Sequence, residues 1–231
     1  MKLTIIIPVY NEVDNIKKIL ESVQDVDLGN IAKEIIIVDD GSTDGSRDML
    51  KDLDGKENIK VLYHKQNQGK GSAIKTGLKA VNGDFVIVQD ADLEYDPSDY
   101  KELLGPILEN KADVVYGSRF LNAKNNRFLS FSQYWGNKFI TFTTNCLFDV
   151  HITDVETCYK LFRREVISDI DIKSRHFDME TEITAKILKK KRRLVEKPIK
   201  YNARGYKMGK KIHLIDGFAA IWALVKYKFL D

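Results

Sequence analysis

Short hydrophobic runs alternate with longer, partly polar segments along the first half of the chain. The runs are rich in β-branched and aromatic residues and predict buried strands at residues 3–9, 34–38, 59–63, 85–88 and 113–117. The segments between them predict helices at about residues 14–23, 46–53, 70–80 and 97–109. Because mostly apolar strands alternate with helices, the pattern predicts an α/β fold with a parallel sheet that is covered on both faces.

The second half of the chain has a less regular pattern. It predicts a polar loop at residues 121–131, an aromatic-rich helix at 134–147, a short strand within 153–162, a helix at 177–190, an edge strand at 194–201 and a tail helix at 212–230. For most residues of the aromatic helix and the tail helix, we favour a place in the hydrophobic core. The chain contains no internal repeat or low-complexity linker, so we expect one domain over residues 1–231.

Polar residues follow each of the five strands of the first half. They are Tyr10 and Glu12, Asp39 and Asp40, Gly69 to Gly71, Asp90 and Asp92, and Ser118 and Arg119. In open α/β sheets, ligands bind beyond the carboxyl ends of the strands. The five loops therefore predict a single site at one edge of the sheet.

Asp90 and Asp92 come directly after the strand at residues 85–88. In an extended backbone, residues two apart point to the same side, and two facing carboxylates favour a cation between them. Oxygen ligands suit Mg²⁺ or Mn²⁺, which complete their shells with water and substrate phosphates. Glu94 offers a third oxygen ligand, so we expect a metal–diphosphate site. The alternative is a solvated acidic loop, because Asp-x-Asp alone is a weak pattern.

The composition is that of a globular protein, with 43% hydrophobic and 31% charged residues among 231. The two cysteines, Cys146 and Cys158, show no disulfide framework, and we expect both to be reduced. The chain shows neither the layout of a signal peptide nor an apolar run of the roughly 20 residues that cross a bilayer. These features favour a cytoplasmic location.

Positive charge is concentrated near the end of the chain, although the net charge is only +3. Residues 186–211 contain twelve Lys or Arg and one acidic residue, Glu196. This segment is either a solvated surface or a basic face for phosphates or an anionic membrane. It lacks a recognisable nucleic-acid-binding module, so we expect no nucleic acid partner. A basic stretch followed by an apolar-faced helix is also typical of a protein that lies peripherally on a membrane.

Several of these segments together resemble family 2 glycosyltransferases of the GT-A fold. The resemblance rests on residues 7–12, 38–45, 67–71 and 90–92. Within that family, residues 90–94, 117–119 and 201–204 look like those of the dolichyl- or polyprenyl-phosphate hexose synthases. The resemblance implies a GT-A domain with a Rossmann-like, mostly parallel twisted sheet flanked by helices. It also implies a nucleotide-sugar-binding half at 1–120 and an acceptor-binding half at 121–231, which ends in an amphipathic tail helix.

On the donor side, the resemblance implies a nucleotide sugar of the GDP-mannose or UDP-glucose type. The positions that match the family's donor site are Pro8, Tyr10, Glu12, Asp39, Lys70 and Asp90, and those that match its Mg²⁺ or Mn²⁺ site are Asp90, Asp92 and Glu94. Such members often carry Gln where Glu94 stands, and a carboxylate there adds negative charge. For Tyr10 and Asp39, the alternative role is in a turn or a helix cap.

On the acceptor side, the resemblance implies a polyprenyl or dolichyl phosphate. This anion attacks the sugar C1 in line, inverts its configuration and needs no general base. Arg119 and Arg204 match positions that contact the acceptor phosphate, and Arg127 is a further candidate. Arginine suits this role because its planar fork binds phosphate through two hydrogen bonds.

Three other functions remain open. A hydroxyl acceptor on a glycan or glycolipid would need a base, and Asp154 lies where relatives of that type carry theirs. Asp154 thus joins Asp92 of the expected metal site and Arg119 of the expected acceptor site as a catalytic candidate. A nucleotide-sugar-binding module without turnover would not need the Asp90/Asp92 pair. A nucleotidyltransferase would carry a Gly-rich basic loop near its N-terminus, unlike residues 8–12 here.

Overall fold

Seven strands form one sheet in the computed structural model, which describes residues 1–56, 58–121, 131–176, 178–203 and 214–230. The strand order is β3-β2-β1-β4-β6-β5-β7. Their bounds are β1 (Lys2–Val9), β2 (Ala32–Asp39), β3 (Ile59–Tyr63), β4 (Phe85–Val88), β5 (Val114–Ser118), β6 (Lys160–Arg163) and β7 (Leu194–Pro198). All neighbours are parallel except those of β6, which runs antiparallel to β4 and β5. The predicted α/β fold with a mostly parallel sheet is confirmed.

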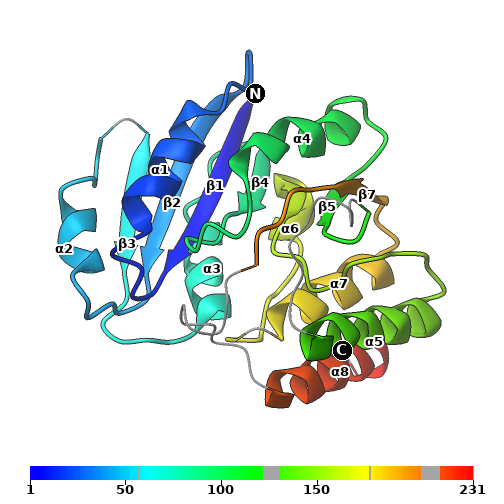
Figure 1. Ribbon diagram of the computed structural model, residues 1–231. Helices are drawn as coiled ribbons and strands as arrows, with labels where there is room; N and C mark the ends of the chain where they lie inside the picture. The colour runs from blue at the N-terminus through cyan, green and yellow to red at the C-terminus, as the bar shows by residue number, and fades with distance from the viewer. Residues whose placement is uncertain (57, 122–130, 177, 204–213, 231) are drawn as a thin grey trace.

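Helices cover both faces of this sheet (Figure 1). They are α1 (Ile16–Asp25), α2 (Ser46–Lys51), α3 (Lys70–Leu78), α4 (Tyr100–Leu108), α5 (Phe131–Phe148), α6 (Arg164–Ser168), α7 (Met179–Lys189) and α8 (Leu214–Phe229), with a 3₁₀ turn η1 (Pro97–Asp99). In Figure 1, α1 and α4 lie in front of the sheet and α3 lies behind it, while α5 and α8 lie side by side below. The short helix α6 was not predicted from the sequence.

The central strands are buried on both faces, as their continuous hydrophobic runs predict. Two consecutive residues of β2, which point to opposite faces of the sheet, show this directly: Ile37 belongs to the core that includes Ile19 of α1, and Val38 clusters with Ala73 of α3. Helix α3 approaches the sheet closely at Gly77, where an added Cβ atom would lie 2.7 Å from Ile6 Cγ2. The sheet is therefore a rigid platform from which the loops at its carboxyl edge project.

The antiparallel strand β6 changes which loops meet at this edge. Ile87 of β4 pairs with Leu161, and Tyr116 of β5 pairs with Lys160, so β6 begins where β4 and β5 end. The segment that precedes β6 therefore joins the loops after β4 and β5. The sequence analysis predicted a strand here but not its direction, because direction depends on which strands become neighbours.

The aromatic helix and the tail helix differ from their expected place in the core. Ile140, Leu224 and Tyr227 are buried, but large aromatic side chains on both helices are exposed, Trp135 by 56% and Trp222 by 61%. The expectation of core packing is thus wrong for the exposed aromatic residues, because each helix has hydrophobic positions on two sides. Within the described residues, no helix has both the length and the apolarity that a membrane span requires.

Candidate functional site

The loop after β4 is a tight turn that holds Asp90, Asp92 and Glu94 at the carboxyl edge of the sheet. Leu93 has a positive φ of 63°, and the backbone N–H of Glu94 donates to Asp92 Oδ1 at 3.1 Å. Just before the turn, the buried Gln89 accepts hydrogen bonds from the hydroxyl groups of Tyr100 and Tyr159, each at 2.5 Å. These contacts fix the backbone that positions the two aspartates.

Glu94 joins this loop to the segment that follows β7. The hydroxyl of Tyr201 donates to Glu94 Oε2 at 2.6 Å, and Tyr95 forms a β-bridge with Tyr201. Among the residues that the structure describes, no three His, Cys, Asp or Glu side chains are arranged to hold a metal ion together. A metal ion held by this loop would therefore take only one or two carboxylate ligands from the described residues and would complete its shell with phosphate and water. Glu94 has a further role, since it anchors Tyr201.

Lys70, at the start of α3, contacts Asp90. Its Nζ lies 2.8 Å from Asp90 Oδ1 and 3.5 Å from Glu180 Oε1. Burial alone lowers the pKa of Lys70, but the two carboxylates outweigh burial and raise this pKa well above its ordinary value. Lys70 is therefore a fixed cation beside Asp90, a suitable neighbour for an anionic diphosphate. Lys70 was among the predicted donor-site residues, but its ion pair with Asp90 was not predicted.

The glycines around Lys70 serve the packing of another segment. An added Cβ atom on Gly71 would lie 2.6 Å from the carbonyl oxygen of Ser174. The backbone N–H of Gly71 donates to the carbonyl oxygen of Arg175 at 2.8 Å. The start of α3 thus bonds to residues 174–175 of the second half of the chain.

The loops after β1, β2 and β3 are tied together by side-chain hydrogen bonds. Asp40 accepts from the backbone N–H of Gln68 at 2.9 Å and of Gly69 at 2.8 Å, and its Oδ1 lies 2.6 Å from His64 Nδ1. The backbone N–H of Glu12 donates to Ser46 Oγ at 3.0 Å. Asp40 therefore stabilises the loops that follow β2 and β3.

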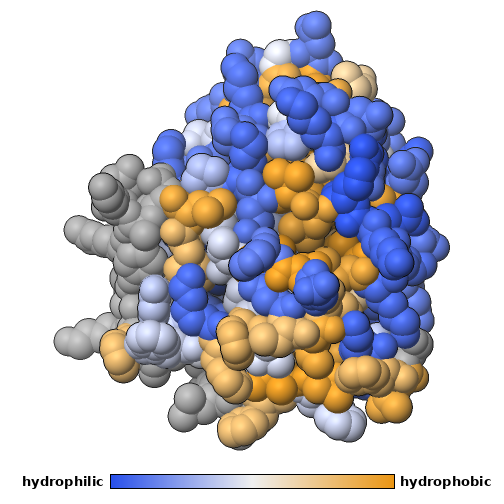
Figure 2. All heavy atoms as spheres, turned by 90° about the vertical axis from the view of Figure 1, so that its right-hand side faces the viewer, coloured by the Kyte–Doolittle hydropathy of each residue, from blue (hydrophilic) through white to orange (hydrophobic). Residues whose placement is uncertain are grey.

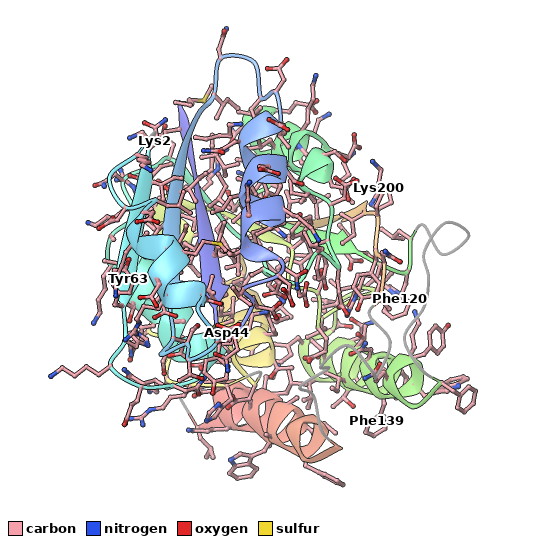
Figure 3. The ribbon with its side chains drawn as sticks, turned by 60° about the vertical axis from the view of Figure 1, so that its left-hand side comes forward. Lys2, Asp44, Tyr63, Phe120, Phe139 and Lys200 are labelled. Carbon is pink, nitrogen blue, oxygen red and sulfur yellow. The ribbon has the colours of Figure 1, made fainter. Side chains whose placement is uncertain are left out.

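The predicted donor-binding residues lie along the same loops. Pro8 is half-buried in β1, and Tyr10 and Glu12 are half-buried in the turn after it. Asp39 is fully buried, accepts from Ser42 N–H at 3.1 Å and accepts from Arg47 Nε at 2.6 Å. Arg47, which donates this hydrogen bond to Asp39, is a residue of the candidate site that was not predicted from the sequence. In Figure 3 the labelled Asp44, from this loop region, lies at the lower end of the sheet.

Arg119 follows β5 and forms a bidentate pair with Asp154. Its Nε and Nη2 donate to the Asp154 carboxylate at 2.8 and 2.7 Å, and its backbone N–H donates at 3.0 Å. Both side chains are buried. The guanidinium carbon also lies 5.3 Å from the centre of the Tyr201 ring. Asp154 therefore orients Arg119, whereas Arg127 and Arg204 lie outside the described residues.

A buried charged cluster beside this pair was missed in the sequence analysis. Lys160 at the start of β6 bonds to Glu180 of α7 and to the carbonyl oxygen of Thr157. Glu156 Oε1 and Thr157 Oγ1 are buried and have no hydrogen-bond partner within the described structure. Burial, reinforced by Glu180 and Asp154, raises the pKa of Glu156 to about 7. The feature of the sequence that could have indicated this cluster is Lys160, a charged residue within the hydrophobic run at residues 158–162.

Comparison with known sequences identifies relatives over most of the chain. Residues 4–171 match the family described as Glycosyl transferase family 2. The UDP-N-acetylglucosamine–dolichyl-phosphate N-acetylglucosaminyltransferase of Methanococcus voltae is 30% identical over 97% of this chain and 95% of that protein. The dolichol-phosphate mannosyltransferase of Pyrococcus furiosus is 34% identical over 52% of this chain, but this match spans only 34% of that protein.

Comparison with solved structures supports the fold. Glucosyl-3-phosphoglycerate synthase from Mycobacterium tuberculosis, in complex with phosphoglyceric acid, superposes with a TM-score of 0.76 at 16% identity. The match covers 100% of this chain and 81% of that one. The same enzyme in complex with Mn²⁺, UDP and phosphoglyceric acid superposes with a TM-score of 0.72. At this low identity the similarity establishes the GT-A fold alone.

The Arg119–Asp154 pair predicts a large loss of stability for Asp154→Asn. The change leaves the Arg119 guanidinium buried without its counter-ion, so the free energy of unfolding should fall by about 3–5 kcal/mol in urea titrations. Asp48→Asn, which breaks a solvent-exposed pair with Lys51, should cost far less, because exposed ion pairs contribute little to stability. Equal losses in the two variants would contradict a buried pair.

Glu156 predicts a pH-dependent contribution to stability. The folded protein keeps this carboxyl protonated up to a pH of about 7, whereas the ordinary pKa is 4.5, so folding loses stability as pH rises between these values. Glu156→Gln removes this loss, and its stability relative to the parent should rise by up to about 3 kcal/mol across the same range. Unfolding titrations at pH 5 and pH 8 measure the effect, with Glu165→Gln on α6 as the matched loss of a carboxylate. If the difference in free energy of unfolding between Glu156→Gln and the parent is the same at pH 5 and pH 8, the raised pKa of Glu156 is refuted.

Proposed function

The chain belongs to glycosyltransferase family 2, and on that basis we propose a metal-dependent, inverting hexosyltransferase that uses a polyprenyl or dolichyl phosphate acceptor. The observation that carries the acceptor class is the similarity over almost the full chain to an enzyme named for dolichyl phosphate. The shorter match to a dolichol-phosphate mannosyltransferase agrees with it. The donor is a nucleotide sugar, of the UDP-sugar or GDP-mannose type.

The first half of the chain, residues 1–120, is proposed to bind the donor. Pro8, Tyr10, Glu12 and Asp39 would contact the base and ribose, with Arg47 already holding one oxygen of Asp39. Asp90 and Asp92, with Glu94 as a further candidate, would hold Mg²⁺ or Mn²⁺, and the ion would neutralise the leaving nucleoside diphosphate. Support comes from the fixed cation of Lys70 beside Asp90, since a second positive charge stabilises the same leaving group.

The second half, residues 121–231, is proposed to bind the acceptor together with Arg119. Arg119, Arg127 and Arg204 would bind the acceptor phosphate and aim one of its oxygens at C1. That oxygen forms the new bond from the face opposite the departing diphosphate, so the configuration inverts and no proton must be removed. Asp154 then acts through Arg119, because its carboxylate holds two of the five N–H donors of the guanidinium.

A hydroxyl acceptor is the second candidate, and one observation favours it. Glu156 has a pKa near 7 and a buried oxygen without a partner in the described structure. A carboxyl group with this pKa suits a general base at neutral pH. Glu156 would then join Asp154 as a candidate base.

The transfer reaction itself is the direct test. Hexose-labelled UDP- and GDP-sugars are incubated with the protein, polyprenyl phosphate and Mg²⁺ or Mn²⁺, and the organic phase is counted. We expect a labelled lipid that releases its sugar in mild acid, because a glycosyl phosphate is acid-labile. Metal-dependent release of free sugar without a lipid product would shift the proposal to a hydroxyl acceptor. If no donor is turned over, both the lipid-phosphate proposal and the hydroxyl-acceptor proposal are wrong.

Asp92→Asn tests the proposed metal site. Asparagine can still accept the hydrogen bond from Glu94 N–H, so the turn should persist while a charged metal ligand is lost. Calorimetry should show metal-dependent donor affinity reduced by about 10–100-fold or more. The control is Asp96→Asn, at a residue that caps η1 through Ser98 N–H. If both variants keep the affinity of the parent, Asp92 does not bind the metal.

A further inference from the structure

Two neighbouring helices expose most of the large hydrophobic side chains on the described surface. We define the α5–α8 face by these residues: Phe131, Trp135, Phe139, Phe142, Phe218, Trp222, Phe229 and Leu230. Only four other large hydrophobic side chains are exposed in the described structure, namely Met1, Tyr63, Leu108 and Leu121. Figure 2 shows hydrophobic side chains gathered along the lower edge of the molecule, where these helices lie. Contiguous patches of this kind mark interaction sites.

The exposed side chains form one stripe on each helix, separate from the side that is already packed. On α5 they recur at intervals of three or four residues from Phe131 to Phe142. The opposite side of α8 is buried through Leu224 and Tyr227, in a cluster that includes Ile140 of α5. Figure 3 shows the labelled Phe139 on the side of α5 that is away from the sheet. The α5–α8 face is therefore not needed to hold the two helices on the protein.

The charged side chains that the structure describes on these helices are all positive. Where the structure describes side chains of α5 and α8, the charged ones are Lys138, Lys226 and Lys228. Lys138 Nζ lies 3.9 Å from the centre of the Phe120 ring, and Lys228 Nζ lies 4.7 Å from that of Phe148. Lysines that lie along aromatic rings can extend their ammonium groups toward water or lipid headgroups at the rim of an apolar surface.

We propose that the α5–α8 face docks on the surface of an anionic lipid bilayer. Exposed tryptophan and phenylalanine with flanking lysine are typical of helices that lie in the interfacial layer. A second copy of the chain fits less well, because the charged side chains described on the two helices are all lysines and would repel one another across such an interface. The face also adjoins the proposed acceptor side, since the Phe120 and Tyr134 rings are 5.5 Å apart and Phe120 follows Arg119. The assignment of this neighbouring region to the acceptor rests on the proposed function.

The tryptophans make the test direct. The chain contains two, Trp135 and Trp222, and both lie on the α5–α8 face. Vesicles of equal parts phosphatidylglycerol and phosphatidylcholine, without polyprenyl phosphate or donor, should shift the tryptophan emission to the blue. Brominated phosphatidylcholine in the same vesicles should quench it, and the protein should sediment with them. Pure phosphatidylcholine should bind more weakly.

Phe139→Ser with Phe218→Ser should reduce vesicle affinity by about tenfold or more, because two exposed apolar anchors are lost. Tyr63→Ser with Leu108→Ser, at exposed positions elsewhere, is the matched control and should bind like the parent. Thermal unfolding checks that both variants fold. Unchanged binding of the first variant, or the absence of a fluorescence shift, would overturn the proposal. So would self-association in sedimentation velocity that Phe139→Ser abolishes, since it would assign the face to a second copy.

The outcome is separable from that of the proposed function. A protein that docks on lipid but transfers no sugar to polyprenyl phosphate keeps the docking surface and loses the proposed reaction. A protein that glycosylates a short, water-soluble prenyl phosphate but does not bind vesicles keeps the reaction and loses the docking surface.

Discussion

The antiparallel insertion of β6 between β4 and β5 is the constraint on which the candidate site depends. It brings the start of β6 to the carboxyl ends of two parallel strands, so residues 153–159 lie beside the loops that carry Asp90 and Arg119. A parallel β6 would place this segment at the other end of the sheet. Asp154 could then not reach Arg119, and Lys160 could not meet Glu180 at this edge.

Buried and partly buried charges are consequently paired across the two halves of the chain. Lys70 and Asp90 from the first half meet Glu180 from the second, which also binds Lys160. Charges in a low-dielectric interior are costly unless they are paired, so these contacts both join the halves and define the charge of the site. Glu156 lies beside the cluster with an oxygen that lacks a partner in the described structure, and its raised pKa follows from that burial.

The two ends of the candidate site differ in their surroundings. On the proposed donor side, backbone N–H groups of the loop after β3 donate to the Asp40 carboxylate, which ties this loop to the one after β2. The proposed acceptor side adjoins α5 and its exposed aromatic side chains through the contact of Phe120 with Tyr134. A soluble nucleotide sugar and a lipid acceptor would thus approach from different surroundings, with Asp90 and Arg119 on the respective sides.

The sequence by itself determined the strands and helices of the first half, the parallel sheet, and the position of Asp90 and Asp92 at a strand end. These are local properties, because hydrophobic periodicity, turn residues and the spacing of two aspartates all lie within a few residues of one another. Only the tertiary structure decided the direction of β6, the pairing of Arg119 with Asp154 35 residues away, and the exposure of the aromatic side chains on α5 and α8. Each of these depends on which elements become neighbours in space. The hydrophobic pattern indicates that a side chain favours burial, but it does not indicate whether another surface of the protein is present to bury it.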